Sequence, residues 1–210
     1  MKRAKVERLY GRLAAAMPAP KSELQFRSPF QLLVAVIMSA QATDKSVNLV
    51  TAPLFSRHDT PAALIKLGQV KLQHAIRSIG LAPTKAKNII ATCECLLEKH
   101  NGEVPAQREA LEALPGVGRK TANVVLNVAF GQPTIAVDTH VFRVANRTGL
   151  GPGKNVTQVE AALLEVTPAE FAQHAHHYLI LHGRHVCKAR KPECGQCVIR
   201  RECEFPDKTA

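Results

Sequence analysis

The chain has 210 residues, enough to build a large hydrophobic interior without a disulfide framework. Lys and Arg number 28 against 17 Asp and Glu, and the resulting formal charge of +11 favours a polyanionic partner such as nucleic acid or an anionic membrane surface. The basic segment 1–12 lacks the apolar stretch of a secretory signal, and the apolar run 32–38 is too short to span a bilayer, so we expect a cytoplasmic protein with reduced cysteines.

Helix start and stop signals recur along the whole chain and predict an all-α fold. Ser28-Pro29 and Thr60-Pro61 precede apolar runs, and the segment 167–170 combines a proline start with a capping box. Glycines fall just past expected helix ends, where a left-handed residue is favoured, at positions 68, 80, 102, 131 and 149. The expected helices cover 3–17, 29–40, 44–55, 61–67, 70–79, 84–100, 106–114, 119–130, 139–148, 157–166 and 168–185. The strand-like stretch 134–138 has no partner strand, so we interpret it as an extended connector.

The stretch "LPGVGRKTA" (114–122) predicts a helix-hairpin-helix. Its glycines allow a ligand to approach the backbone, and the second helix directs the positive end of its dipole outward. Such a turn binds phosphate and fixes the register of DNA without reading its sequence. An ordinary helical hairpin is the alternative for this motif taken alone.

Lys120 lies on the first turn of the second hairpin helix, and two interpretations are open. The simpler one is a further phosphate contact. The more demanding one is a nucleophile, because a helix N-terminus and the neighbouring Arg119 disfavour the ammonium form and leave some free amine. A nucleophile acting on a sugar carbon needs a carboxylate nearby, and Asp138 in "AVDTH" supplies one. Asp138 is also expected to cap the helix that begins at Thr139.

The C-terminal cysteines follow the spacing C-x6-C-x2-C-x5-C, at Cys187, Cys194, Cys197 and Cys203. Four thiolates in so short a loop predict a metal site, either a tetrahedral zinc or a [4Fe-4S] cluster. The basic residues between the first two cysteines would form a positive finger that presses on a phosphate backbone. We interpret Cys93 and Cys95 as buried packing residues, and the histidines between 174 and 185 as partly core and partly DNA-facing.

Taken in order, the hairpin, the "VDTH" aspartate and the cysteine loop resemble the iron-sulfur, helix-hairpin-helix DNA glycosylases of the endonuclease III family. The segments "SAQATD" (39–44) and "IGLAPTKA" (79–86) are also similar to family motifs, so the resemblance covers nearly the whole chain. It implies a six-helix lobe at 22–133 and a cluster lobe formed by 1–21 with 134–210. DNA is implied to lie across the groove between the lobes, and the cofactor is implied to be a [4Fe-4S] cluster.

The resemblance also implies roles for particular residues. Lys120 matches a Schiff-base lysine, and Asp138 matches the carboxylate that assists it. Gln41 matches the residue that fills the gap left by a flipped nucleotide, and Leu81 matches a wedge on the opposite strand, as a base inside a duplex must be rotated out to react. The implied DNA contacts are Gly116, Val117, Gly118, Arg119 and Lys191, and the implied substrate pocket holds Ser39, Asp44 and His140.

The sequence therefore predicts a monomeric DNA glycosylase and abasic-site lyase that acts in a bacterial cytoplasm, at the nucleoid. Its expected substrate is double-stranded DNA with oxidised pyrimidines or abasic sites, cut 3′ to the lesion by β-elimination; no membrane partner is expected. One alternative is an adenine- or mismatch-specific glycosylase of the same superfamily. The other is a non-catalytic module that binds DNA or senses redox state.

Overall fold

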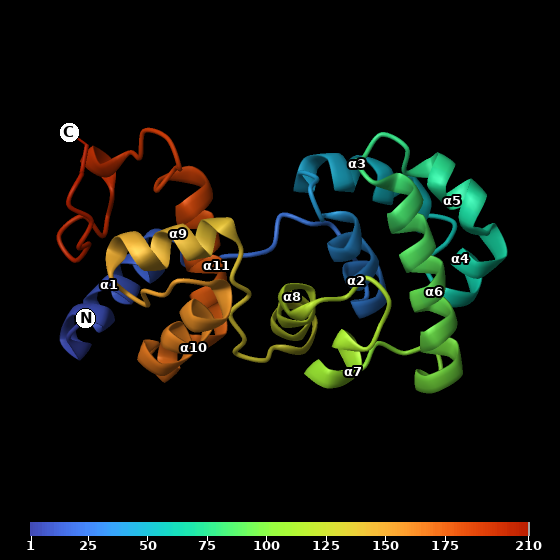
Figure 1. The fold of residues 1–210 in the computed structure, drawn as a ribbon, viewed down its shortest axis with the longest axis horizontal. Coiled ribbons are helices and arrows are strands. Elements are labelled where there is room, and N and C mark those ends of the chain that lie inside the picture. Colours follow the sequence, from blue (N-terminus) through green and yellow to red (C-terminus); the bar gives the residue numbers. More distant parts are fainter. Residues whose placement is uncertain (210) are drawn as a thin grey trace. The chain divides into compact units, whose positions relative to one another are not determined.

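The structure, a computed structural model, describes residues 1–209 and confirms the all-α prediction (Figure 1). Within this range there are helices but no strands. In chain order the helices are α1 (Arg3–Ala16), α2 (Pro29–Met38), α3 (Asp44–Phe55), α4 (Pro61–Leu67), α5 (Gln69–Ala75), α6 (Ala82–His100), α7 (Arg108–Glu112), α8 (Arg119–Phe130), α9 (Thr139–Thr148), α10 (Val156–Val166), α11 (Ala169–His185) and the 3-10 turn η1 (Cys194–Gln196). None of these helices has the length and apolar character needed to cross a membrane.

The chain forms two compact units. One is the continuous segment Ser22–Gly131, and the other joins residues 1–21 to the chain from Gln132 onward. The first unit contains seven helices, α2 to α8, which lie close to the seven that the helix signals predicted in this segment. Gly68, whose φ is +83°, separates α4 from α5, as the glycine past the expected helix end predicted.

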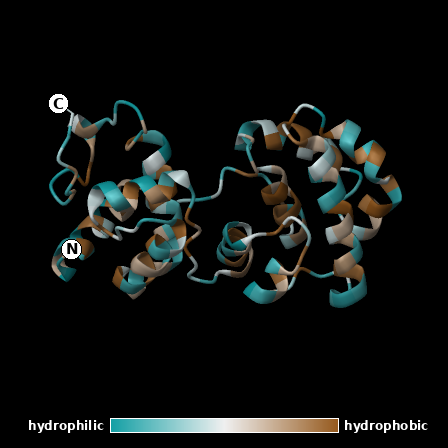
Figure 2. Ribbon diagram, viewed as in Figure 1, coloured by the Kyte–Doolittle hydropathy of each residue, from teal (hydrophilic) through white to brown (hydrophobic). Residues whose placement is uncertain are grey.

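The continuous unit is built around α2, which is apolar on all sides and coloured largely brown in Figure 2. Every residue from Phe30 to Met38 is buried, as expected for a helix enclosed by neighbours. Its start follows from the sequence: Pro29 occupies the first turn, and the Ser28 hydroxyl accepts a hydrogen bond from the Gln31 N–H at 3.2 Å. Helices α3, α6 and α8 pack against α2, and α7 packs against α8, which positions the two helices that bear the hairpin.

In the discontinuous unit, α1 packs against α11 although the two are far apart in sequence. The α1 side chains Leu9, Tyr10 and Leu13 are fully buried. The Tyr10 ring stacks on Phe171 with centroids 5.6 Å apart, and its hydroxyl is hydrogen-bonded to Thr167 at 2.8 Å. The segment 134–138 is an extended connector, as predicted, and Ile135 and Val137 contribute to the same core.

The structure corrects three expectations at helix ends. Helix α5 ends at Ala75, not at 79, and a turn follows it. In that turn Gly80 was expected to be left-handed, but Leu81 takes this conformation instead, with φ of +62°. The capping box at 167–170 does not form, because the Thr167 hydroxyl donates backwards to the Leu163 carbonyl at 2.6 Å and closes α10. Pro168 therefore precedes α11 without a side-chain cap.

Candidate functional site

The predicted hairpin is present between α7 and α8, and a side chain of α6 is hydrogen-bonded to its turn. The Val117 N–H donates to the Leu114 carbonyl at 3.1 Å, and the Thr92 hydroxyl of α6 donates to the Pro115 carbonyl at 2.7 Å. Gly116 has φ of +76°, and a Cβ on it would lie 2.7 Å from Asn88 Nδ2. This position thus needs glycine for its conformation and for its packing.

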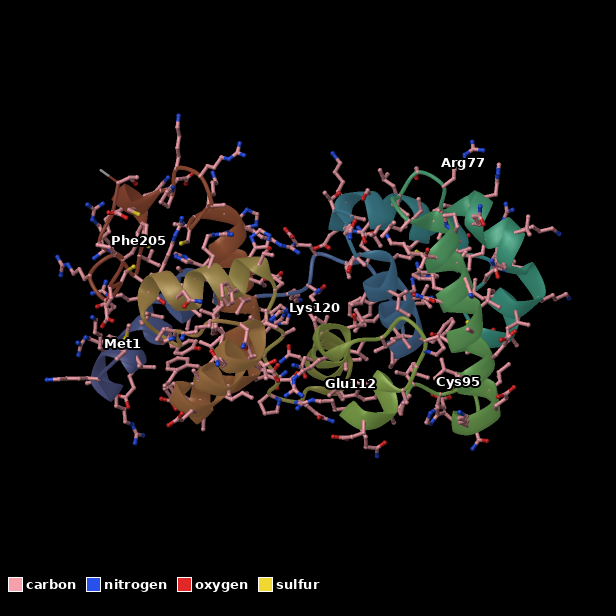
Figure 3. The ribbon with its side chains drawn as sticks, in the orientation of Figure 1. Met1, Arg77, Cys95, Glu112, Lys120 and Phe205 are labelled. Atoms are coloured by element: carbon pink, nitrogen blue, oxygen red, sulfur yellow. The ribbon has the colours of Figure 1, made fainter. Side chains whose placement is uncertain are left out.

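The outer surface of the hairpin is open where α8 begins. Gly118, Arg119 and Lys120 are exposed, whereas Val117 is buried beneath the turn. A Cβ on Gly118 would meet no atom within 4 Å, so a ligand can approach the backbone at the positive end of α8. Lys120, labelled in Figure 3, is the second residue of that helix. The arrangement suits a bound phosphate with an amine held beside it.

Asp138 is held rigidly by its own backbone surroundings. It is the N-cap of α9, as predicted, and its Oδ1 accepts hydrogen bonds from the N–H groups of His140 at 2.8 Å and Val141 at 2.9 Å. The buried connector before it fixes the approach of the chain, and the carboxylate itself is half-buried. Both of these bonds use one oxygen, so the cap does not occupy the second. Asp138 and His140 belong to the discontinuous unit, and Lys120 to the continuous one.

Gln41 and Leu81 lie in two adjacent turns of the continuous unit, so the structure brings these predicted residues together. A Cβ on Gly80 would lie 3.9 Å from the Gln41 carbonyl oxygen. Both residues are left-handed, with φ of +55° and +62°, and both are exposed. Such a conformation costs a non-glycine residue on the order of 1 kcal/mol and is concentrated at functional sites. The turns thus present a polar amide and an apolar side chain to solvent.

Ser39 and Asp44 flank the Gln41 turn. Ser39 ends α2, and its hydroxyl donates to the Val36 carbonyl at 2.8 Å. Asp44 is the first residue of α3, which Thr43 caps by accepting a hydrogen bond from the Ser46 N–H. Both side chains are half-buried, and their place in a substrate pocket remains a prediction.

The four C-terminal cysteines line one small pocket of the discontinuous unit. No three His, Cys, Asp or Glu side chains in the described chain are arranged to hold a single metal ion. Four thiols that line one pocket supply the set of soft ligands that an iron–sulfur cluster requires. Burial raises the pKa of Cys197 and Cys203, so binding of the cluster must supply the free energy that deprotonates them.

Two arginines of α9, Arg143 and Arg147, hold the cysteine loop, and neither was predicted from the sequence. Arg147 donates to the carbonyls of Lys188 at 2.7 Å and Ala189 at 3.0 Å, and its Nη1 lies 3.7 Å from Cys187 Sγ. Its guanidinium also lies over the Phe205 ring, 4.7 Å from the centroid. Arg143 donates to the Cys187 carbonyl at 2.8 Å. Their i, i+4 spacing on α9 was the available signal.

Helix α1 also binds the C-terminal end of this loop, through ion pairs. Lys5 pairs with Glu204 at 2.8 Å, and Arg12 pairs with the buried Glu202 at 3.2 Å. Between the cysteines, Lys191 is exposed and left-handed, with φ of +50°. The basic finger is therefore ordered by contacts at its base.

The remaining sulfur and imidazole groups are mainly structural. Cys93 is fully buried, and burial raises the pKa of its thiol to about 12, so it is inert. Cys95, labelled in Figure 3, is half-buried, which corrects the expectation of full burial. On α11 the buried histidines are His176, His177 and His182, whereas His174 and His185 are exposed.

Comparison with known proteins relates the sequence and the fold of this chain to one protein family. Residues 34–169 match the family model described as HhH-GPD superfamily base excision DNA repair protein, and residues 187–203 match the iron-sulfur binding domain of endonuclease III. The second match begins and ends at the outer two cysteines of the loop. The chain is 61% identical to endonuclease III of Escherichia coli K12 over 99% of both chains. It is 61% identical to endonuclease III of Haemophilus influenzae over 94% of this chain and 93% of the relative.

Solved structures give the same result. A trapped covalent endonuclease III–DNA intermediate matches with a TM-score of 0.91 and 45% identity, covering 97% of this chain and 96% of the other. A thermostable thymine-DNA glycosylase matches with a TM-score of 0.84, covering 97% and 95% of the two chains. At 22% identity the latter shows a shared fold alone.

Proposed function

Because the chain belongs to the endonuclease III family of the HhH-GPD superfamily, we propose that it removes oxidised pyrimidines from DNA with Lys120 as nucleophile and Asp138 as assisting carboxylate. The protein is a bifunctional glycosylase and lyase of base excision repair, its partner is DNA, and it carries a [4Fe-4S] cluster. Damaged or abasic double-stranded DNA as substrate, a monomeric state and a location at the nucleoid in a bacterial cytoplasm belong to the proposal.

The observation that carries the residue assignment is the exposed Lys120 on the first turn of α8, beside an open phosphate-binding turn. Phosphates bound at the hairpin would fix the DNA backbone and leave the amine facing a sugar carbon. Positioning of this kind lowers a reaction barrier by several kcal/mol, about 7–11 in well-oriented systems.

The chemistry then follows from the amine. Lys120 Nζ bonds to the sugar C1′, and the glycosidic bond breaks so that the base leaves with the bonding electron pair and takes up a proton. The bound amine then loses a proton and the C1′–O4′ bond breaks, which opens the sugar ring, leaves its electron pair on O4′ and gives a C1′=N cation that acidifies the C2′ protons. Loss of one of them expels the 3′ phosphate and cuts the strand, which is the β-elimination of a lyase. Asp138 stabilises the cationic sugar and relays protons. A water nucleophile would release the base and stop there.

Gln41 and Leu81 are proposed to enter the duplex when the damaged nucleotide is extruded. The amide can stack and hydrogen-bond in the vacated space, and the leucine can wedge the opposite strand. Their adjacency and exposure support these roles. Ser39, Asp44 and His140 are the proposed lining of the pocket for the flipped base.

Cys187, Cys194, Cys197 and Cys203 are the proposed cluster ligands, since they line one pocket and bound the matched segment. The bound cluster would supply thiolate bonds that order the loop. The ordered loop presents Lys191 to a phosphate.

Replacing Lys120 by Ala tests the nucleophile directly. We expect strand cleavage to be lost almost completely, while binding to abasic DNA weakens by no more than about tenfold, because a single exposed charge contributes roughly 1 kcal/mol. Borohydride should trap a covalent protein–DNA adduct with the native protein and none with Lys120→Ala. Arg119→Ala, the exposed neighbour, is the matched control and should still be trapped. Trapping of Lys120→Ala at the native rate would assign the chemistry to another amine.

A further inference from the structure

A lysine that the proposed chemistry does not use is buried beside the two exposed turns. Lys85 of α6 is only 4% exposed, and its Nζ is buried without a hydrogen-bond acceptor. Burial lowers the pKa of this amine. Buried lysines are rare, and an unsatisfied ammonium in the interior is unfavourable to folding. The native sequence nevertheless places one here.

The position of Lys85 ties it to the Leu81 turn. Its backbone N–H donates to the Leu81 carbonyl at 2.9 Å, so the two residues are one helical turn apart. Side chains on a helix lean toward its N-terminus, which directs Lys85 over the first turn of α6 and toward the Leu81 turn. Gly80, in that turn, adjoins the Gln41 carbonyl. The backbone of Lys85 is thus tied directly to the Leu81 turn, which in turn adjoins the Gln41 turn.

Three unfavourable features thus occur in one region of the continuous unit. They are the unsatisfied Lys85 amine and the left-handed backbones of Gln41 and Leu81. A rearrangement of the turns that brings carbonyl oxygens to Lys85 Nζ would give the buried amine the hydrogen bonds it lacks. Insertion of the Gln41 and Leu81 side chains into a base stack is the event that would shift these turns.

We propose that Lys85 is a positioning residue for duplex opening: when Gln41 and Leu81 enter the DNA, Lys85 Nζ donates hydrogen bonds to backbone carbonyl oxygens of their two turns. These bonds form only in the DNA-bound state and offset part of the cost of unstacking the bases. Lys85 contacts neither the sugar nor the base. The inference rests on the insertion of Gln41 and Leu81 proposed above.

The test compares two substrates with the same abasic site. One is a fully paired duplex, and the other carries the site inside a three-base unpaired bubble, where the stack is already open. For Lys85→Met we expect kcat/KM on the duplex to fall at least tenfold, with the bubble changed less than twofold. The melting temperature should stay level or rise, since an unsatisfied buried amine is replaced by an apolar side chain of similar length.

Further variants and a spectroscopic signal sharpen the result. Lys85→Arg should recover part of the duplex activity, and Lys87→Met, on the exposed face of the same helix, should behave as native. Fluorescence of 2-aminopurine opposite the abasic site should rise on binding of the native protein and not of Lys85→Met. Equal losses on duplex and bubble, a lowered melting temperature, or an unchanged duplex rate would each overturn the role of Lys85.

Leu81→Ala separates this inference from its premise. If Leu81 is the wedge, that variant also loses activity selectively on the duplex. A selective loss for Leu81→Ala without one for Lys85→Met removes the Lys85 role and leaves the wedge. No selective loss for Leu81→Ala removes the wedge and the inference built on it. Borohydride trapping of the native protein tests the chemistry independently of both.

Discussion

Asp138 caps α9 and is proposed to assist the chemistry, and these two duties depend on different properties of its side chain. The cap needs an oxygen that accepts from two backbone N–H groups, which an amide oxygen also provides. The chemistry needs the negative charge. Substitution can therefore separate the two duties.

Asp138→Asn should retain the stability of the native fold and lose most of the base-release and strand-cleavage activity. Asp138→Ala should lose the activity and also about 1 kcal/mol of unfolding free energy, because α9 loses its cap. Denaturant unfolding and single-lesion cleavage assays on both variants check these outcomes. A fully active Asp138→Asn would show that Asp138 is a structural cap alone.

Among the elements, the cysteine loop depends most on contacts made by other parts of the chain. Arginine-to-carbonyl hydrogen bonds from α9 and ion pairs from α1 hold it in place. These contacts position the thiols but do not replace the cluster, since metal binding supplies folding energy in such loops.

The purified protein should be yellow-brown, with broad absorbance at about 400 nm from thiolate-to-iron charge transfer. Cys194→Ser should lose this band and disorder the loop before it affects Lys120, because it removes a ligand from the unit that does not contain α8. Absorbance, iron content and limited proteolysis measure this. A colourless native protein with stoichiometric zinc would contradict the iron assignment.

Arg147→Lys should weaken the loop although the charge is kept. Lysine cannot donate to two carbonyls in a planar fork while stacking on Phe205. We expect the 400 nm band to decay severalfold faster under an iron chelator, whereas Arg201→Lys, at an exposed position, should decay at the native rate. Equal decay of the two variants would mean that Arg147 does not support the cluster.

Local sequence signals predicted most of the elements, because caps such as Ser28, Thr60 and Asp138 act within three residues of the groups they bind. The errors lie at helix ends, where a side chain bonded to another partner or a neighbouring residue took the expected conformation. Thr167 turns back to Leu163 and contacts Tyr10 of α1 instead of capping α11. Gly80 was expected to be left-handed, but the turn places that strain on Leu81.

In the candidate site, too, features formed by residues close in sequence were predicted, and features formed by distant residues were missed. The hairpin, Lys120 and the cysteine spacing are readable because their residues are close in sequence. Arg147 reaches the loop across about 40 residues of chain, and its helical spacing alone did not distinguish it from a solvent-exposed arginine. The burial of Lys85 was equally invisible, since lysine is ordinarily a surface residue.

For the whole molecule, the charge of +11 sets how strongly DNA binding depends on salt. Affinity for undamaged duplex should fall steeply as salt rises, with a log–log slope of about −0.9 for each phosphate neutralised and roughly four to six such contacts. Arg119→Ala and Lys191→Ala should each reduce the slope by about 0.9 without changing the preference for a lesion. Fluorescence anisotropy across a salt series measures both. An affinity that does not vary with salt would show that the basic surface does not contact the backbone.

The order in which the chain enters its two units also has a consequence for its synthesis on the ribosome. The segment Ser22–Gly131 is continuous, so its helices can assemble as soon as they emerge. Helix α1 is made first, but the buried face with Leu9, Tyr10 and Leu13 packs on α11, which ends at His185. At about 5–20 residues per second, α1 waits roughly ten to thirty seconds for its partner. During that interval the apolar face of α1 has no partner in its own unit, and the basic residues on the rest of the helix must keep it in solution. A chain released before α11 is made would leave this apolar face exposed to aggregation.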